Sequence, residues 1–78
     1  MDLQTKENIK LLNKYIGVLN DREKDIIRRR YGLGNIKEQT QKSIAKEMNI
    51  SRSYVSRIEK RALIKMLREF IKNKNITE

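Results

Sequence analysis

The pattern of apolar and polar positions is most informative between Gln41 and Lys60, QKSIAKEMNISRSYVSRIEK. Apolar or small residues recur there at spacings of three and four, which is typical of two amphipathic helices. These interior positions are Ile44, Ala45, Met48, Ile50, Val55 and Ile58. Between the two predicted helices, Asn49 tolerates the positive φ of a tight turn, and Ser51 is suited to cap the second helix. Spacing, turn and cap together predict a helix-turn-helix unit of the kind that reads DNA.

The outward side of the second predicted helix carries hydrogen-bond donors and no acid. Opposite the apolar stripe lie Arg52, Ser53, Ser56, Arg57 and Lys60. A solvated helix face normally mixes acids and bases, whereas an arginine can offer a guanine two hydrogen bonds, worth about 1–3 kcal/mol of discrimination. This side therefore favours base reading by the first four residues. Two amphipathic helices of an ordinary small bundle, with solubilising arginines, remain the alternative.

Upstream of this unit, the pattern predicts a first helix from a cap at Thr5 to about Leu19. Its first apolar stripe consists of Ile9, Leu12, Ile16 and Leu19. A second stripe lies beside the first and is larger than one packing face requires. The helix is therefore either wedged between two neighbours or exposes part of its surface to another protein. Together with two leucines of the last helix, the candidate docking surface is Leu11, Tyr15, Val18, Leu63 and Leu67.

The remaining elements follow from cap and stop signals. Asn20 and Glu23 form a capping-box pattern for a second helix, which Gly32 is suited to end. The arginines at its end, residues 28–30, favour the helix dipole or contact phosphate. Residues 32–39 read as a loop, and Thr40 caps the first helix of the helix-turn-helix. The last helix is expected from Arg52 to about residue 72, so the prediction is an all-α, four-helix domain with a long recognition helix.

Composition narrows the function classes. The chain has 78 residues, which we expect to form one domain, and its net charge is +9, from 19 basic and 10 acidic residues. Such a charge points to a polyanion, nucleic acid first. Without Cys or His, thiolate nucleophiles, zinc sites and imidazole bases are excluded, so we expect no enzyme and no cofactor. No apolar run approaches the roughly 20 residues of a membrane span, and we expect a cytoplasmic protein.

Three segments carry a resemblance to a known family. LNDREKDIIRRRYGL, TQKSIAKEMNIS and SYVSRIEKRALIKM resemble region 4 of the sigma-70 family of bacterial RNA polymerase promoter-recognition subunits, over roughly Leu19 to Met66. The details most closely resemble the sporulation-type sigma factors. The resemblance implies a domain that reads the −35 promoter element in the major groove while docked on the flap of the polymerase β subunit. Because the regions that melt the −10 element are missing, we expect an excised domain or a truncated chain.

The resemblance also implies roles for individual residues. Arg22 and Arg30 match positions that touch the DNA backbone, and Gln41 and Lys42 match a helix start whose N–H groups bind phosphate. The base-reading positions correspond to Arg52, Ser53, Ser56 and Arg57. Housekeeping members carry Arg-Glu and Arg-Gln at those two pairs. The serine at position 53 therefore removes an acceptor for cytosine, and we expect a different −35 preference.

Further phosphate contacts follow from the residues themselves, namely Lys42, Lys46, Lys60 and Arg61. The expected partners are promoter DNA, the polymerase core, and activators or an anti-sigma factor. We expect no binding to a membrane. Two other functions stay open at this point. One is the helix-turn-helix output domain of response regulators, and the other is a helical interaction protein or a basic amphipathic helix on anionic lipid.

Overall fold

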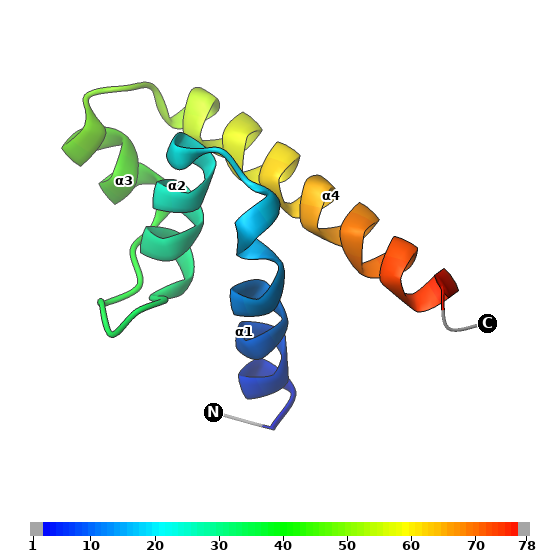
Figure 1. Ribbon diagram of the computed structural model, residues 1–78. Helices are drawn as coiled ribbons and strands as arrows, with labels where there is room; N and C mark the ends of the chain where they lie inside the picture. The colour runs from blue at the N-terminus through cyan, green and yellow to red at the C-terminus, as the bar shows by residue number, and fades with distance from the viewer. Residues whose placement is uncertain (1–2, 77–78) are drawn as a thin grey trace.

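The computed structural model describes the backbone of residues 3–76 and the side chains of residues 9–74. Its elements, in chain order, are α1 (Leu3–Tyr15), the 3₁₀ turn η1 (Ile16–Val18), α2 (Asp21–Tyr31), α3 (Gln41–Met48) and α4 (Arg52–Ile76). Figure 1 shows α2 and α3 beside the first half of α4, whereas the second half of α4 extends away from them. The described residues contain no strand, so the all-α prediction is confirmed.

Each predicted cap of the central helices is formed. The Asn20 side chain accepts from the Glu23 N–H, and the Glu23 carboxylate accepts from the Asn20 N–H, both at 2.9 Å, which completes the capping box. The Thr40 hydroxyl accepts from the Ser43 N–H at 3.0 Å. The hydroxyl of Ser51 accepts from the Tyr54 N–H at the same distance. These bonds satisfy N–H groups that a helix start leaves without intrahelical partners.

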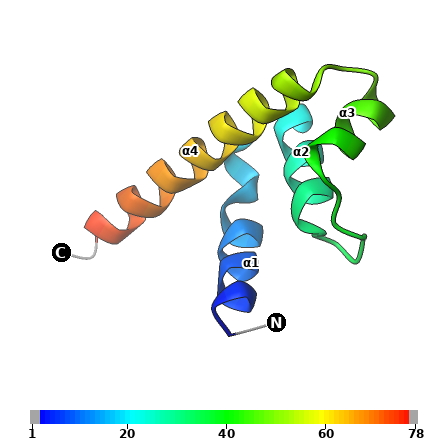
Figure 2. The same ribbon diagram turned by 180° about the vertical axis from the view of Figure 1, so that it is seen from behind.

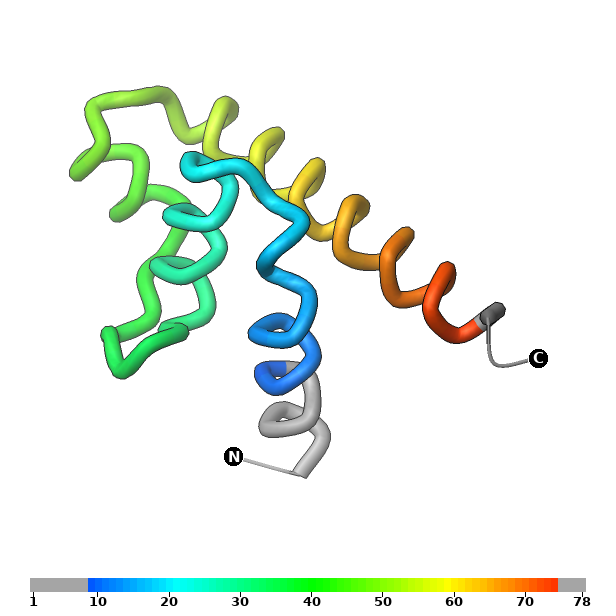
Figure 3. Tube along the Cα trace, in the orientation of Figure 1, coloured from blue at the N-terminus to red at the C-terminus, as the bar shows by residue number. Residues whose placement is uncertain are grey.

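The two turns also use the predicted residues. Gly32 ends α2 with a φ of 65°, and the Leu33 N–H donates to the Arg28 carbonyl at 3.0 Å, as in a Schellman motif. Asn49 ends α3 with a φ of 57°, which places α4 at its angle to α3. Figure 3 traces both connections, the long return from α2 to α3 and the short turn into α4.

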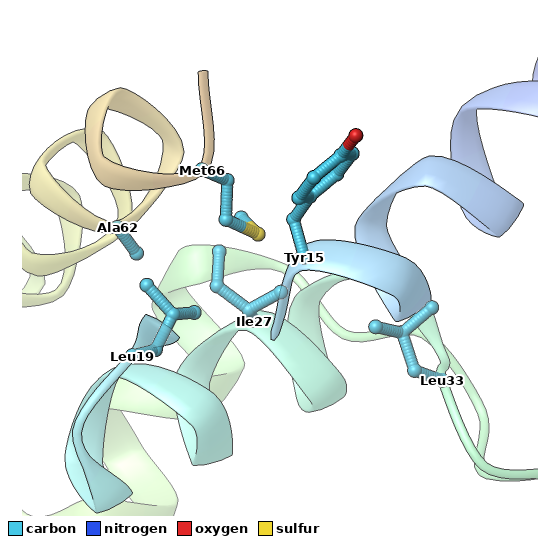
Figure 4. Close-up of a cluster of buried hydrophobic side chains, with 6 residues drawn as sticks. All are labelled: Tyr15, Leu19, Ile27, Leu33, Ala62 and Met66. Carbon is cyan, nitrogen blue, oxygen red and sulfur yellow. The ribbon is translucent and has the colours of Figure 1, made fainter. Parts of the chain in front are cut away.

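Two hydrophobic clusters hold the helices together. The first contains Tyr15, Leu19, Ile27, Leu33, Ala62 and Met66, drawn in Figure 4. The second contains Ile26, Ile44, Ala45, Val55 and Ile58, with Met48 and Ile50 packed against it. Adjacent isoleucines of α2 thus face different clusters, so α2 joins the helix-turn-helix to the N-terminal helix. The six predicted interior positions of residues 41–60 all lie in or against the second cluster, which confirms that prediction.

The first and last helices differ from their predicted limits. Thr5 is not the N-cap of α1, because the helix already begins at Leu3. The α-helix ends at Tyr15 and tightens to a 3₁₀ turn around Gly17, instead of continuing to Leu19. At the other end, α4 continues to Ile76, past the predicted limit near residue 72. From their closest approach at η1, α1 and α4 diverge toward the two termini (Figures 1 and 2).

Candidate nucleic-acid interface

The first turns of α4 present the predicted base-reading side chains to solvent. Arg52, Ser53, Ser56 and Arg57 are all exposed. On the opposite side of the same turns, Val55 and Ile58 are buried in the second cluster. Helical periodicity alone therefore separates a packing side from an open side. The open side is the surface that a DNA-reading helix requires.

A shallow hollow lies between the start of α3 and this open side. It is lined by Gln41, Arg52, Ser53, Ser56 and Arg57. The two arginines contribute donors and the two serines contribute hydroxyls that can donate or accept. The structure thus brings the four predicted base-reading residues together with one of the predicted phosphate-binding residues. Whether each touches a base or a phosphate stays a prediction.

Two arginines near the end of α2 donate hydrogen bonds to side chains or backbone of other elements. The Arg29 Nε donates to Asp25 and its Nη1 to Glu47, at 2.9 and 2.8 Å. These interactions raise the pKa of Arg29, the hydrogen bond to Asp25 first, against the effect of burial. Arg30 donates from Nε to Glu59 at 3.2 Å and from Nη1 to the Gln39 carbonyl at 3.3 Å. Both guanidinium groups therefore hold helices together, which the sequence reading of residues 28–30 did not foresee.

For Arg30, the internal contacts change the expected role. Its side chain is about one-third exposed, at 33%. A guanidinium group that already donates to a carboxylate and a carbonyl has fewer free donors for a phosphate. Its predicted contact with the DNA backbone stays a prediction, and its position in the structure is that of a tie between α2 and α4.

Glu59 is the residue at this site that sequence reasoning missed. It is only 7% exposed, and its carboxylate accepts from three side chains of two other elements. The donors are Arg30 Nε at 3.2 Å, the Tyr31 hydroxyl at 2.9 Å and Gln41 Nε2 at 2.8 Å. Burial, and then the bond to this carboxylate, raise the pKa of Tyr31. An acid on the packing side of a basic helix was the available sequence signal.

The second buried acid, Glu23, ties α2 to the middle of α4. It is 3% exposed, and Lys65 Nζ lies 2.9 Å from its carboxylate. Burial raises the pKa of Glu23, but the hydrogen bond from the Asn20 N–H, the contact with Lys65 and the charge of Arg61 outweigh it and lower the pKa below 4.5. Glu23 is therefore an ionised capping residue that also fixes the helix crossing.

Arg22 of α2 and Arg61 of α4 lie near each other where these two helices pack. The Arg22 guanidinium lies 5.7 Å from the centre of the Tyr54 ring, in cation–π contact. Together with Asn20, Glu23 and Ile58, the residues Arg22, Tyr54, Arg57 and Arg61 line a second, smaller hollow. Among the described residues, no ion pair within 4 Å involves Arg22, Arg57 or Arg61. Tyr54, exposed between these cations, was not among the predicted site residues.

The predicted phosphate-binding lysines are also open to solvent. Lys42 and Lys46 lie on exposed positions of α3, and Lys60 lies on the exposed side of α4. Thr40 engages the Ser43 N–H, so the N–H groups of Gln41 and Lys42 stand at the start of α3 next to the hollow. A helix start of this kind, with cations beside it, favours an anion.

The candidate docking surface requires a correction. Tyr15 is 8% exposed and belongs to the first cluster, where its ring meets Phe70 edge-on at 6.0 Å, so the expectation that it is a surface residue is wrong. Val18 is exposed but does not line the apolar groove between α1 and α4. Tyr15 is buried because α4 crosses α1 at that point. The spacing of residues within one helix cannot reveal such a crossing.

An apolar groove does lie between the diverging α1 and α4. Its volume is about 390 Å³, and its lining consists of Leu11, Leu12, Tyr15, Tyr31, Leu63, Met66, Leu67 and Phe70. Four of the five predicted docking residues line this groove, namely Leu11, Tyr15, Leu63 and Leu67. Of these, Tyr15 is buried, whereas Leu67 is 54% exposed. Leu63 is partly buried against the first cluster, whereas Leu67 stays open to solvent.

No group of three or more His, Cys, Asp or Glu side chains among the described residues could hold a metal ion. None of the helices described is both long and apolar enough to cross a membrane.

The sequence matches the family model described as Sigma-70, region 4, over residues 15–68. Among curated proteins, it is 53% identical over 70 residues to an RNA polymerase sigma-28 factor of Bacillus thuringiensis subsp. kurstaki, covering 90% of this chain and 30% of that protein. It is 56% identical over 68 residues to the RNA polymerase sigma-K factor of Bacillus subtilis, covering 87% of this chain and 23% of that protein. The RNA polymerase sigma-E factor of Clostridium acetobutylicum is 48% identical over 54 residues, covering 69% of this chain and 23% of that protein.

These relatives agree with the sporulation-type resemblance, and they favour a sigma-factor domain over the response-regulator alternative. The chain spans less than a third of the length of each of these relatives. No solved structure matches it closely enough to be counted as a relative. The family match covers most of the chain, including the capping box, the helix-turn-helix and the open side of α4, and the chain therefore belongs to the sigma-70 region 4 family of RNA polymerase sigma factors.

Proposed function

We propose that this chain binds the −35 element of promoter DNA as the C-terminal domain of an RNA polymerase sigma factor and so directs transcription initiation. The single observation that carries the proposal is the open side of α4, where Arg52, Ser53, Ser56 and Arg57 are exposed opposite a buried apolar stripe. A major groove of B-DNA admits one α-helix, and side chains on its outward side reach the base edges.

In this proposal, base reading and phosphate binding use different residues. Arg52 and Arg57 donate to guanine O6 and N7, and the serines contribute weaker contacts. Phosphates on either side are bound by Lys42, Lys46, Lys60, Arg22 and Arg61, together with the N–H groups at the start of α3. Phosphate contacts fix the register of the helix without reading sequence, so their loss weakens all duplexes alike.

The apolar groove between α1 and α4 is, in this proposal, the docking site for the β-subunit flap of RNA polymerase. Leu11, Leu63 and Leu67 line it, so the proposed docking residues are these three, with Tyr15 as a buried support. An open apolar groove of this kind suits an amphipathic helix of a partner protein. Val18, exposed outside the groove, is not included.

The setting follows from the same proposal. We expect the protein to act in the bacterial cytoplasm, at the nucleoid through the polymerase, without catalysis of its own. Activators or an anti-sigma factor are further expected partners. Initiation itself requires the polymerase core and the parts of a sigma factor that act at the −10 element.

A footprint on promoter DNA tests the proposal. The chain, with and without polymerase core, is added to duplexes that carry promoters from an organism with a closely related sigma factor. We expect protection confined to the −35 region, stronger when the core is present. Protection that is equal on promoter and scrambled duplexes, with and without core, would contradict the proposal.

A further inference from the structure

Gln41, the first residue of α3, has a side-chain amide whose orientation is set by a buried acid. Its Nε2 donates to Glu59 Oε1 at 2.8 Å. The same carboxylate is ion-paired with Arg30 at 3.2 Å and accepts from the Tyr31 hydroxyl at 2.9 Å. Glu59 therefore accepts from three side chains and is only 7% exposed, so it is a fixed acceptor beside Gln41.

This acceptor decides which way the amide of Gln41 points. An ion-paired carboxylate accepts hydrogen bonds and donates none, so the nitrogen of the amide must face Glu59. The carbonyl Oε1 then lies on the side of the amide turned away from Glu59. Gln41 also lines the hollow on the open side of α4. The buried carboxylate thus makes the exposed part of Gln41 an acceptor, with one N–H left over.

An acceptor is the group that this surface otherwise lacks. Of the side chains lining the hollow, the arginines only donate and the serine hydroxyls adapt to either role. The Gln41 carbonyl is the obligate acceptor among them. In the major groove, obligate acceptors pair with exocyclic amino groups, which only adenine and cytosine present. A phosphate oxygen is itself an acceptor, so it cannot form a hydrogen bond with this side-chain carbonyl.

We propose that the Gln41 side chain reads an adenine or a cytosine in the DNA site through Oε1, and that Glu59 is its positioning residue. The inference rests on the proposed promoter-binding function and adds a specificity determinant to it. With adenine, the remaining Nε2–H donates to N7 and completes a bidentate pair. Gln41 thereby supplies an acceptor that the serine at position 53 does not, while its backbone N–H stays free for phosphate.

The test compares base preferences. The 78-residue chain selects duplexes from a random library at low salt, and its affinity is then measured for every single-base substitution of the selected site. Gln41→Ala, Glu59→Gln and the double variant are measured on the same duplexes, with Lys42→Ala as the neighbouring control. Circular dichroism checks folding, and Gln41→Ala leaves Glu59 bound to Arg30 and Tyr31, so its fold is preserved.

We expect the wild-type chain to prefer adenine or cytosine at one position by roughly tenfold. Gln41→Ala abolishes the preference at that position and leaves the others unchanged. Glu59→Gln reduces the same preference, because an amide at position 59 no longer dictates the orientation of Gln41, and the double variant behaves as Gln41→Ala alone. Lys42→Ala weakens all duplexes alike.

Three results overturn the inference while leaving the proposed function intact. These are unchanged preferences in Gln41→Ala, an equal loss on all duplexes in that variant, or a Gln41-dependent preference for guanine or thymine. A wild-type chain that selects no sequence overturns the proposed function and the inference together. If Glu59→Gln does not fold, Gln41→Ala alone decides between these outcomes.

Discussion

Replacing Gly32 by alanine tests how the turn after α2 places the helix-turn-helix. Gly32 adopts a φ of 65°, and a Cβ built on it would lie 2.9 Å from the Ile36 carbonyl oxygen and 3.2 Å from the Glu38 nitrogen. Both neighbours are backbone atoms, which cannot rotate away as a side chain does. The loop that leads into α3 would therefore have to shift by several tenths of an ångström.

The structure supplies a matched control in the same loop. Gly34 has a φ of 78°, but nothing lies within 4 Å of a Cβ at that position. A left-handed conformation costs a non-glycine residue about 1–2 kcal/mol, partly offset by about 0.4–1 kcal/mol from the stiffer unfolded chain. Forcing an atom into a filled space adds about 1–3 kcal/mol. We therefore expect a loss of about 1 kcal/mol for Gly34→Ala and about 2–4 kcal/mol for Gly32→Ala.

Urea and thermal unfolding, followed by circular dichroism, measure the difference. For a chain of this size, each kcal/mol lowers the melting temperature by about 4–8 °C, so the two variants should be clearly separated. Gly32→Asn, which tolerates the positive φ but carries a Cβ, should recover only part of the loss. Equal destabilisation by Gly32→Ala and Gly34→Ala would refute the close approach as the reason for glycine at position 32.

Three further perturbations test the interface, the groove and the buried acid. Arg52→Ala should lower affinity for the selected duplex by about 1–3 kcal/mol and leave affinity for scrambled DNA unchanged. Lys46→Ala should weaken binding to both duplexes alike and reduce the slope of log affinity against log salt concentration by about 1. Equal losses on both duplexes for both variants would contradict the division into a base-reading arginine and a phosphate-binding lysine. Leu67→Asp should abolish binding to polymerase core in a pull-down, and the chain should stay folded because Leu67 is 54% exposed. Val18 is 42% exposed and lies outside the groove, so the control variant Val18→Asp should bind the core normally. The folded-state pKa of Glu23 is lowered, so its contribution to stability is present above pH 4.5 and is lost as the pH falls through the folded-state pKa. The free energy of unfolding of the wild type should therefore exceed that of Glu23→Gln at neutral pH, and the difference should shrink on acidification. A constant difference from pH 7 to acid would exclude this role.

The local signals were sufficient for most of the fold. Asn20, Thr40 and Asn49 lie where their side chains or permitted φ values predict, because caps and tight turns depend on a few neighbouring residues. The split of α4 into a packing side and an open side was also predictable, since it follows from helical periodicity. The exposed positions of Arg52 and Arg57 are therefore a property of the sequence itself.

What depended on contacts between distant residues could not be read from the sequence. Tyr15 follows the spacing of a surface stripe, yet the crossing of α4 buries it, and only the relative placement of the two helices decides this. Likewise, the hydrogen bond from Arg30 to Glu59, 29 residues away in the chain, exists only because α2 and α4 pack together. Periodicity states which residues share a side of one helix. Which helix meets that side, and with which partner atoms, is decided by tertiary packing, and at this interface packing selects the arginines that remain free.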